Sequence, residues 1–460
     1  MATAAERFAE WATSVRYEDI PSDVIEHAKD HLLDTIGCGL AASAVGVAGE
    51  GRSAMASLGG AGDATVIGGP SMPAANAAFA NAMLCHGLDF DDTHSGSVSH
   101  VSTVVCPAAW AVAQATDASG RELITAIVAG NEIVTRVGMA ACGAFHKRGF
   151  HPTSICGIFG ATAAVGRLYG YDADTITRAL GIAGSMASGL FAYLEDGTPT
   201  KPIHPAWAAH GAILASSLAQ FGAIGPKSVF EGTFGLYHAF VELAEIDLEE
   251  QLADLGTRWE TPNIAYKPYP ACHFMHGALG AAAQAADGRT FRSEEIDEVL
   301  VTVPSAGVSL VLEPEDQKQL PRSEYEGKFS LQYSTAAMLA RGRVGVADYT
   351  DEAISDQSVL DISTKVRYET KEYPTYPQAF PGGVRITTTG GDVLDAEFPY
   401  QKGGPDNPMS RADVLAKYRE NAVTALGASA MQALEAAVMS IDSLDDVSEA
   451  FAPLAQARAA

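Results

Sequence analysis

The chain has 460 residues, of which 47% are hydrophobic and 19% are charged, as in ordinary globular proteins that contain two domains. Its formal net charge of −26 argues against nucleic acid or an anionic membrane as a partner, because phosphate groups are bound by clustered Lys and Arg. No Cys-x-x-Cys pair occurs among the six cysteines, so we expect no zinc ribbon or thioredoxin-like centre and a reduced, cytoplasmic compartment.

Most of the first 264 residues show the apolar periodicity of helices. The stretch 202–226 contains no Asp, Glu, Lys or Arg, but two His and three Gly dilute its apolar character. It therefore predicts a helix buried in a large helical core rather than a membrane span. The other expected helices cover residues 22–42, 73–87, 107–118, 122–141, 157–170 and 175–194.

The pattern changes after about residue 263, where Val-rich strand segments appear. Residues 384–399 predict two alternating strands that are joined at Gly390–Gly391 as a hairpin. Further strands are expected at 295–304 and 363–370, with helices at 330–342 and 351–362, and helices resume from Asp413. We therefore expect a mainly α fold, in which an all-helical domain (1–264 and 401–460) carries an inserted, smaller α+β domain (265–400).

One short segment, HGLDFDDTHSGSVSH (86–100), holds three aspartates and three histidines. Its spacing matches neither a calcium loop nor an H-E-x-x-H zinc helix, so no metal is expected there. A histidine and a carboxylate at the mouth of a buried helical core can tune each other's pKa and exchange protons near neutrality. The alternative is a helix end that is capped by aspartates. Capping, packing or supporting roles are expected for His86, Asp91, Asp92 and His94.

Four other segments supply positive charge or polar groups. In HKRGFHPTSICG (146–157), His151 precedes a Pro-fixed turn into a helix start, whose free N–H groups favour an anion. In TKPIHPAWAAHG (200–211), Lys201 precedes the uncharged helix, where it points either into a site or to solvent. A surface basic loop is the alternative for the first segment. The remaining two are AYKPYPACHFMHG (265–277), at the expected domain junction, and KFSLQYS (328–334).

Taken in order, and with the closing GGPDNPMS (403–410), these segments resemble the MmgE/PrpD family over nearly the whole chain. That family includes 2-methylcitrate dehydratase, cis-aconitate decarboxylase and iminodisuccinate epimerase. The resemblance implies a helical domain with a smaller lid domain, a homodimer, and a site without metal or cofactor. It implies catalytic roles for Asp89, His100, His151 and Lys201, and substrate-binding roles for Thr93, Lys267, Cys272, His273 and Tyr333.

The family's substrates are small di- or tricarboxylates, and its shared chemistry is proton transfer at a carbon next to a carboxylate or a conjugated C=C bond. Such a reaction passes through a carbanionic state that needs positive charge nearby. The leading expectation is a metal-independent hydro-lyase that dehydrates a 2-methylcitrate-like substrate. A decarboxylase or epimerase of the same fold is the alternative, and Cys272, which stands where the animal decarboxylase has a histidine, argues against the decarboxylase. A non-catalytic carboxylate-binding protein and a metal-dependent, aconitase-like enzyme are weaker alternatives.

Overall fold

The computed structural model describes residues 2–241 and 246–459, which form two compact units. The larger unit comprises Met1–Ala192, Thr200–Ile264 and Ser410–Ala460. The smaller unit comprises Tyr193–Pro199 and Ala265–Met409. Each unit has its own buried apolar core.

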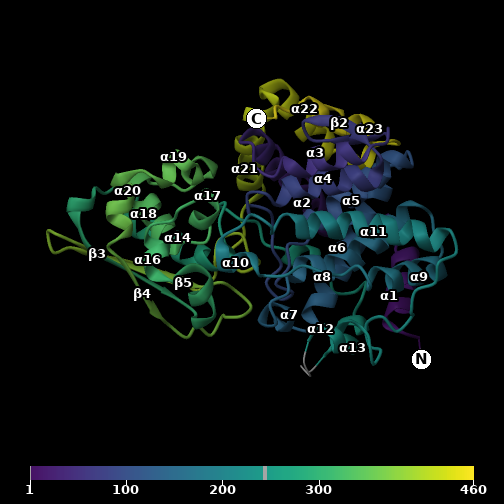
Figure 1. Cartoon of the computed structure of the whole chain (residues 1–460), viewed down its shortest axis with the longest axis horizontal. Coiled ribbons are helices and arrows are strands. Elements are labelled where there is room, and N and C mark those ends of the chain that lie inside the picture. Colours follow the sequence, from purple (N-terminus) through teal and green to yellow (C-terminus); the bar gives the residue numbers. More distant parts are fainter. Residues whose placement is uncertain (1, 242–245, 460) are drawn as a thin grey trace. The chain divides into compact units, whose positions relative to one another are not determined.

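The larger unit is built from helices that pack side by side (Figure 1). Glycines let two of them approach closely, since a Cβ added to Gly160 in α8 would lie 2.3 Å from the carbonyl oxygen of Gly130 in α6. The long helices are α1 (Ala4–Ser14), α2 (Ser22–Ala44), α3 (Glu50–Leu58), α4 (Ala74–His86), α5 (Ser102–Ala115), α6 (Gly120–Met139), α8 (Pro152–Leu168), α9 (Ala173–Ala183) and α11 (Ile203–Gln220).

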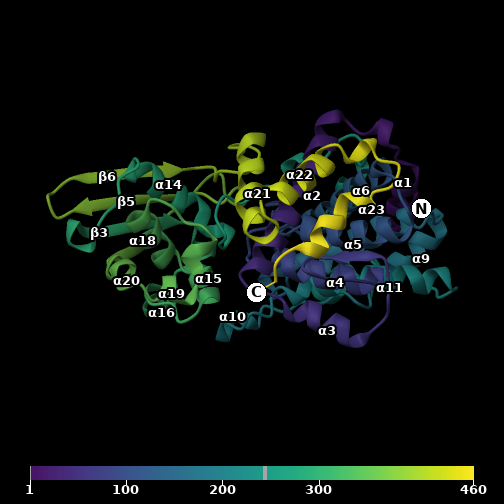
Figure 2. The same ribbon diagram turned by 90° about the horizontal axis from the view of Figure 1, so that it is seen from above.

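The C-terminal part of the chain returns to the larger unit and completes it. Here α21 (Arg411–Leu426) and α22 (Ala428–Met439) pack on α2, near the first helices of the chain (Figure 2). Strands β1 (Ala64–Val66) and β2 (Gly69–Met72) pair as an antiparallel ribbon. The short helices are α7 (Ala144–Lys147), α12 (Leu236–Phe240), α13 (Leu248–Ala253) and α23 (Ser448–Phe451).

The smaller unit contains a four-stranded sheet with the order β4-β3-β5-β6. Strand β3 (Ile296–Val303) is parallel to β4 (Val366–Thr370) and antiparallel to β5 (Gly382–Thr388), which forms a hairpin with β6 (Val393–Phe398). Helix α14 (His276–Ala286) packs on the hairpin and α18 (Leu331–Arg341) packs on α14. The short helices are α10 (Tyr193–Asp196), α15 (Val308–Val311), α16 (Glu315–Gln319), α17 (Glu324–Gly327), α19 (Asp351–Ile354) and α20 (Gln357–Ser363).

The mainly α fold and the hairpin at Gly390–Gly391 are confirmed, but three helix boundaries were wrong. Helix α5 begins at Ser102 rather than at residue 107, because the Asp92 carboxylate accepts a hydrogen bond from the Ser102 N–H (3.1 Å) and caps the earlier turn. Helix α8 begins at Pro152 rather than at residue 157, with Pro in its favoured first position. Helix α9 ends at Ala183 rather than near residue 194, and a turn over 184–186 and irregular backbone follow it.

The uncharged stretch at 202–226 does form a helix, α11, as expected. Across the described ranges, no helix is both long and apolar enough to cross a membrane.

Candidate active site

The segment between α4 and α5 folds back on itself inside the larger unit. It leaves α4 at His86, and a bridge between His94 and Ser99 closes a small turn before His100. Asp89 and Val98 adopt left-handed backbone angles, with φ +51° and +53°, which non-glycine residues rarely do. Strained backbone of this kind persists where the surroundings hold it in place, and it is concentrated at functional sites.

Asp91 lies between two imidazole rings. Its Oδ2 atom is 2.8 Å from Nδ1 of His86 and 3.2 Å from Nδ1 of His100. Burial alone would raise the pKa of Asp91, but the two imidazoles lower it below its usual range, so the carboxylate is ionised. An ionised carboxylate only accepts hydrogen bonds, so both rings present N–H at Nδ1, and the other nitrogen of each ring is available for proton transfer.

Lys201 supplies a positive charge on the other side of His100. Its Nζ donates to Oδ1 of Asp89 (2.8 Å) and lies 3.4 Å from Nε2 of His100, while Asp89 lies 3.6 Å from the same nitrogen. All three side chains are at least nine-tenths buried. The structure therefore brings three of the expected catalytic residues into one cluster, with Lys201 delivered by the turn that precedes α11.

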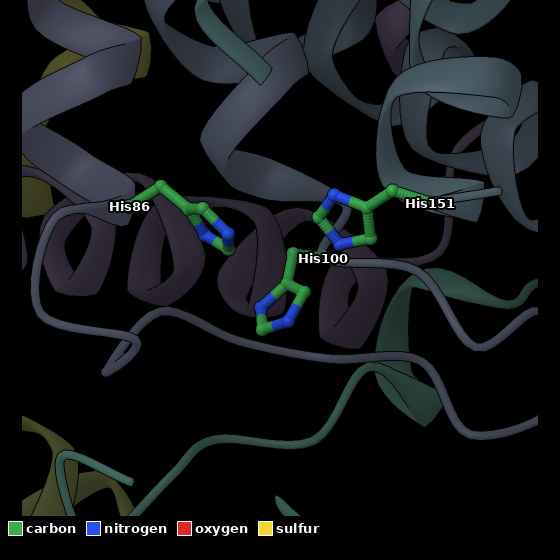
Figure 3. Close-up of side chains that lie close together, drawn as sticks. All are labelled: His86, His100 and His151. Atoms are coloured by element: carbon green, nitrogen blue, oxygen red, sulfur yellow. The ribbon is translucent and has the colours of Figure 1, made fainter. Parts of the chain in front are cut away.

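His151, the fourth expected catalytic residue, lies beside the same cluster. Figure 3 shows its ring together with those of His86 and His100, and the centroids of the latter two are 5.7 and 5.9 Å from that of His151. Nδ1 of His151 forms a hydrogen bond with Nδ1 of His204 (3.1 Å). Burial lowers the pKa of His151 well below its usual value, and Lys201 lowers it further. His151 is therefore a neutral imidazole near pH 7.

The backbone around His151 is fixed by the chain that follows α9. The His151 N–H donates to the carbonyl of Gly189 (3.0 Å), and Phe150 and Leu190 form a β-bridge. A Cβ on Gly189 would lie 3.3 Å from Cγ of His204 and 3.2 Å from Cβ of Ser154. Glycine at 189 thus allows both the backbone conformation and the close approach to the histidine pair.

The cluster has the atoms of a metal site, although the sequence predicted none. His86, His100 and His151 offer ligand atoms within 4.8 Å of one another, and Asp89 and Asp91 join the first two in an overlapping set. Buried nitrogen and carboxylate donors of this kind can hold a divalent ion. The Lys201 ammonium already contacts Asp89 and His100, however, and its charge opposes a dication at the same atoms. The donor set therefore fits a proton-transfer cluster better than a metal centre.

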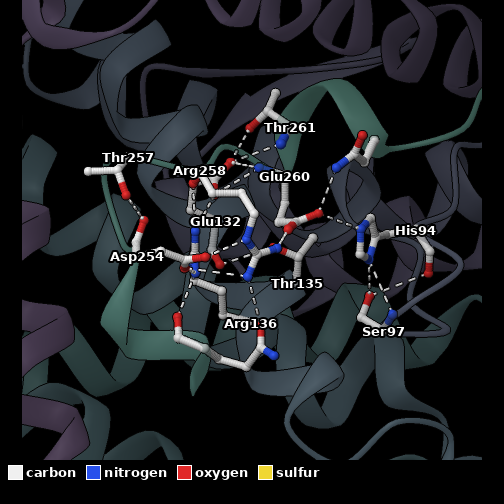
Figure 4. Close-up of polar contacts among 12 residues, drawn as sticks. His94, Ser97, Glu132, Thr135, Arg136, Asp254, Thr257, Arg258, Glu260 and Thr261 are labelled. Atoms are coloured by element: carbon white, nitrogen blue, oxygen red, sulfur yellow. Dashed lines mark hydrogen bonds and ion pairs between the residues drawn. The ribbon is translucent and has the colours of Figure 1, made fainter. Parts of the chain in front are cut away.

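A buried polar network supports the far end of the turn (Figure 4). Nε2 of His94 contacts Oε2 of Glu260 (3.2 Å), and the Glu260 backbone N–H donates to Glu132. Burial raises the pKa of Glu132 to about 7, against the lowering effect of Arg136, whose Nη2 is 3.6 Å away. Thr93, which directly precedes His94 in the chain, is buried.

The remaining predicted residues belong to the smaller unit. Lys267, Cys272 and His273 are buried, and His273 begins a short 3₁₀ turn before α14. Tyr333 is fully buried, and its hydroxyl lies 2.6 and 2.9 Å from the carbonyl oxygens of Asp348 and Ala353, as in a structural side chain. Their roles in substrate binding stay predictions.

Sequence reasoning gave Asp91 and His86 only supporting roles and did not single out His204. All three lie in the cluster, and Asp91 touches His100 directly. The sequence did contain a signal for His204, which stands in the uncharged helix start IHPAW. A histidine in such apolar surroundings usually has a polar partner.

Comparison with known proteins places both units in one family. The model of the MmgE/PrpD N-terminal domain matches residues 6–249, and the model of the MmgE/PrpD C-terminal domain matches residues 269–443. Cis-aconitate decarboxylase of Aspergillus terreus is 28% identical over 461 residues, which cover 95% of this chain and 93% of that protein. The human cis-aconitate decarboxylase is 28% identical over 464 residues (96% and 92%). The 2-methylcitrate dehydratase of Salmonella typhi is 23% identical over 381 residues (76% and 74%).

Proposed function

Because the chain belongs to the MmgE/PrpD family, whose matched relatives are lyases, we propose that it is a carboxy-lyase acting on a small tricarboxylate similar to cis-aconitate. The observation that carries the proposal is the buried cluster in which Asp91 holds His100 against Lys201 and Asp89. Such a cluster provides a proton donor and a fixed positive charge in one place, which are the two requirements of a carbanionic intermediate.

In the proposed reaction, the carbon–carbon bond to one carboxylate breaks and CO₂ leaves. The electron pair that remains on carbon is conjugated with the C=C bond and a second carboxylate, and Lys201 stabilises the developing negative charge. His100 is assigned the proton that replaces CO₂, because its ring lies inside the cluster, with the Asp91 carboxylate 3.2 Å from Nδ1 and the Lys201 ammonium 3.4 Å from Nε2. His151, which is neutral, takes up a proton from solvent and returns it to His100, whose ring centroid is 5.9 Å away, so that the donor is restored after each turnover.

A dehydratase acting on a 2-methylcitrate-like substrate is the second candidate. There a base removes a proton next to a carboxylate, and hydroxide leaves with a proton from the acid as water. The same residues support this reaction, and the match to a 2-methylcitrate dehydratase favours it. Although Cys272 favoured the dehydratase at the level of sequence, the decarboxylase is placed first, because the matches to the two decarboxylases named above are more similar and extend over more of the chain.

We also propose that the protein is a homodimer. Apolar side chains are exposed at the C-terminal end of α11 and directly after it. Leu218 is 39% exposed, Phe221 is 87% exposed and Ile224 is 83% exposed. Contiguous exposed apolar residues mark protein–protein contacts. Light scattering coupled to size exclusion should give twice the chain mass, and Phe221→Glu should halve it.

The proposed activity is tested by incubating the purified protein with cis-aconitate, 2-methylcitrate, citrate and iminodisuccinate, each followed by NMR. Loss of CO₂ from cis-aconitate supports the first candidate, and water loss from 2-methylcitrate replaces it with the second. If the protein turns over none of the four compounds, both candidate functions are wrong. A parallel sample treated with a strong chelator should keep its rate, because side chains supply the proton transfer and the charge stabilisation in the proposed steps.

A further inference from the structure

The residue before and the residue after Asp91 are each held from behind the active site. The carbonyl oxygen of Phe90 accepts a hydrogen bond from Nζ of Lys417 (2.8 Å), and Oδ2 of Asp92 lies 2.8 Å from Nδ1 of His31. Both contacts are buried, and both come from parts of the chain far from residues 86–100. Asp91 therefore lies between two fixed points.

Lys417 reaches this position from α21, the first helix of the C-terminal segment. Its Nζ also pairs with both carboxylate oxygens of Asp34 in α2, at 2.8 and 3.0 Å, and stands 4.1 Å from the centre of the Phe90 ring. Burial alone would lower the pKa of Lys417, but the Asp34 carboxylate raises it above its usual value, so the ammonium is charged. One buried cation thus joins two helices to the backbone of the active-site segment.

The backbone that Lys417 contacts is strained. Asp89, one residue before Phe90, has φ +51°, a left-handed conformation that is unfavourable for a non-glycine residue. Such a conformation lasts only when neighbouring contacts over-determine it. The hydrogen bond to the Phe90 carbonyl lies where it can hold this turn, and with it the placement of Asp89 against Lys201 and of Asp91 against His100.

We propose that Lys417 is a positioning residue for the active site, which acts by fixing the Phe90 carbonyl and so the geometry of Asp89 and Asp91. Its described contacts are with Asp34 and Phe90, and neither His100 nor Lys201 is among them. The kinetic part of the test below rests on the proposed function, because it needs a substrate that the protein turns over.

The test uses two variants and a matched control. Lys417→Met leaves Asp34 buried and unpaired, and loss of one partner from a buried ion pair destabilises proteins strongly, so this variant alone reports little about position. The double variant Asp34→Leu/Lys417→Met removes both charges and should recover the melting temperature, while the hydrogen bond to Phe90 stays absent. The control is Lys29→Met, which removes a buried lysine of α2. Within the described part of the chain, Lys29 forms its ion pairs with Glu26 and Asp442 and not with residues 86–100.

In the double variant we expect kcat to fall at least tenfold with KM changed less than threefold, and amide hydrogen exchange over residues 87–101 to accelerate. Lys29→Met should lower the melting temperature but leave both kcat and exchange in that segment unchanged. A double variant with wild-type kcat and wild-type exchange over 87–101 would overturn the proposal. The exchange measurement needs no turnover, so it decides the role of Lys417 even if the wild-type protein acts on none of the four substrates and the proposed function fails.

Discussion

The Asp91 carboxylate lies 3.2 Å from Nδ1 of His100. The carboxylate accepts the hydrogen bond, because an ionised carboxylate has no proton to donate. It therefore fixes the ring's N–H at Nδ1 and leaves Nε2 next to Lys201, 3.4 Å away. The orientation of one proton-transfer group is thus set by a residue that does not itself reach the Lys201 side of the ring.

Asp91→Asn should lower kcat by about 10²–10⁴-fold, the usual contribution of a positioned acid or base, with little change in KM. The amide keeps the shape of the side chain, but its NH₂ group can donate to an imidazole nitrogen and so allow the other tautomer. Steady-state kinetics with the substrate that the wild-type protein turns over, together with a melting curve, checks this. A variant that melts like wild type and keeps more than a third of its kcat would contradict the assigned role.

Gly189→Ala should reduce activity at least tenfold and destabilise the protein by about 1–3 kcal/mol, because alanine rarely adopts φ +124° and its Cβ would meet His204 and Ser154. The expected loss arises from displacement of the carbonyl that accepts the His151 N–H. Gly170→Ala is the matched control. Gly170 also has a positive φ, +70°, but no atom lies within 4 Å of an added Cβ, so stability should fall while kcat stays. Equal losses of kcat in both variants would remove Gly189 from the site.

The free energy of unfolding should fall as the pH drops from 7.5 to 5.5. Burial lowers the pKa values of His94, His146 and His204 to about 4, below the value of ~6.5 in an unfolded chain. Between these values the unfolded state binds more protons than the folded state, so acid favours unfolding. Glu132 opposes this, because burial raises its pKa to about 7 and the folded state binds its proton first.

His151, whose pKa burial also lowers well below its usual value, adds to this loss. With four histidines against one glutamate, the net loss is on the order of 3 kcal/mol over this pH interval. Urea unfolding at the two pH values measures it. Glu132→Gln removes the opposing contribution and should make the loss larger, whatever its effect on absolute stability. A free energy of unfolding that is constant or higher at pH 5.5 would show that these histidines are protonated in the folded protein.

Arg136→Met should destabilise the protein by about 3–5 kcal/mol, since it leaves Glu132 buried without its cation. The guanidinium also donates to the carbonyls of Gln251 (2.5 Å) and Arg258 (2.6 Å), which fix the segment before Glu260 (Figure 4). Urea unfolding checks the loss. Adding Glu132→Gln should restore part of the stability, and a double variant that is no more stable than Arg136→Met would show that the carboxylate is not the cause.

The sequence predicts those parts of the molecule that depend on local pattern. Val-rich alternation around Gly390–Gly391 is sufficient to predict the hairpin of β5 and β6, and apolar periodicity is sufficient for α2, α4 and α11. It did not predict the start of α5, because the cap comes from Asp92 in a preceding loop. Long-range side-chain contacts of this kind leave no periodic trace.

The same reason limits the prediction of the site. Asp89, His100, His151 and Lys201 were identified through motifs, and the structure brings them together in the larger unit. The roles of Asp91 and Lys417 depend on distances that no spacing reveals, since Lys417 and Phe90 lie far apart in the chain yet share a hydrogen bond. A lysine in an ordinary amphipathic helix gives no sign in the sequence that it is buried.

The central claim, that His100 delivers a proton to a substrate carbon, is tested most directly by turnover of cis-aconitate in D₂O, with the product examined by NMR. We expect a product that has lost one carboxylate and carries a single deuterium at a carbon that bore none, because the imidazole proton exchanges with solvent. The His100→Gln protein, if folded as judged by its melting curve, should form this product at least a hundredfold more slowly. A product without deuterium, or a folded His100→Gln protein with wild-type turnover, would contradict the claim.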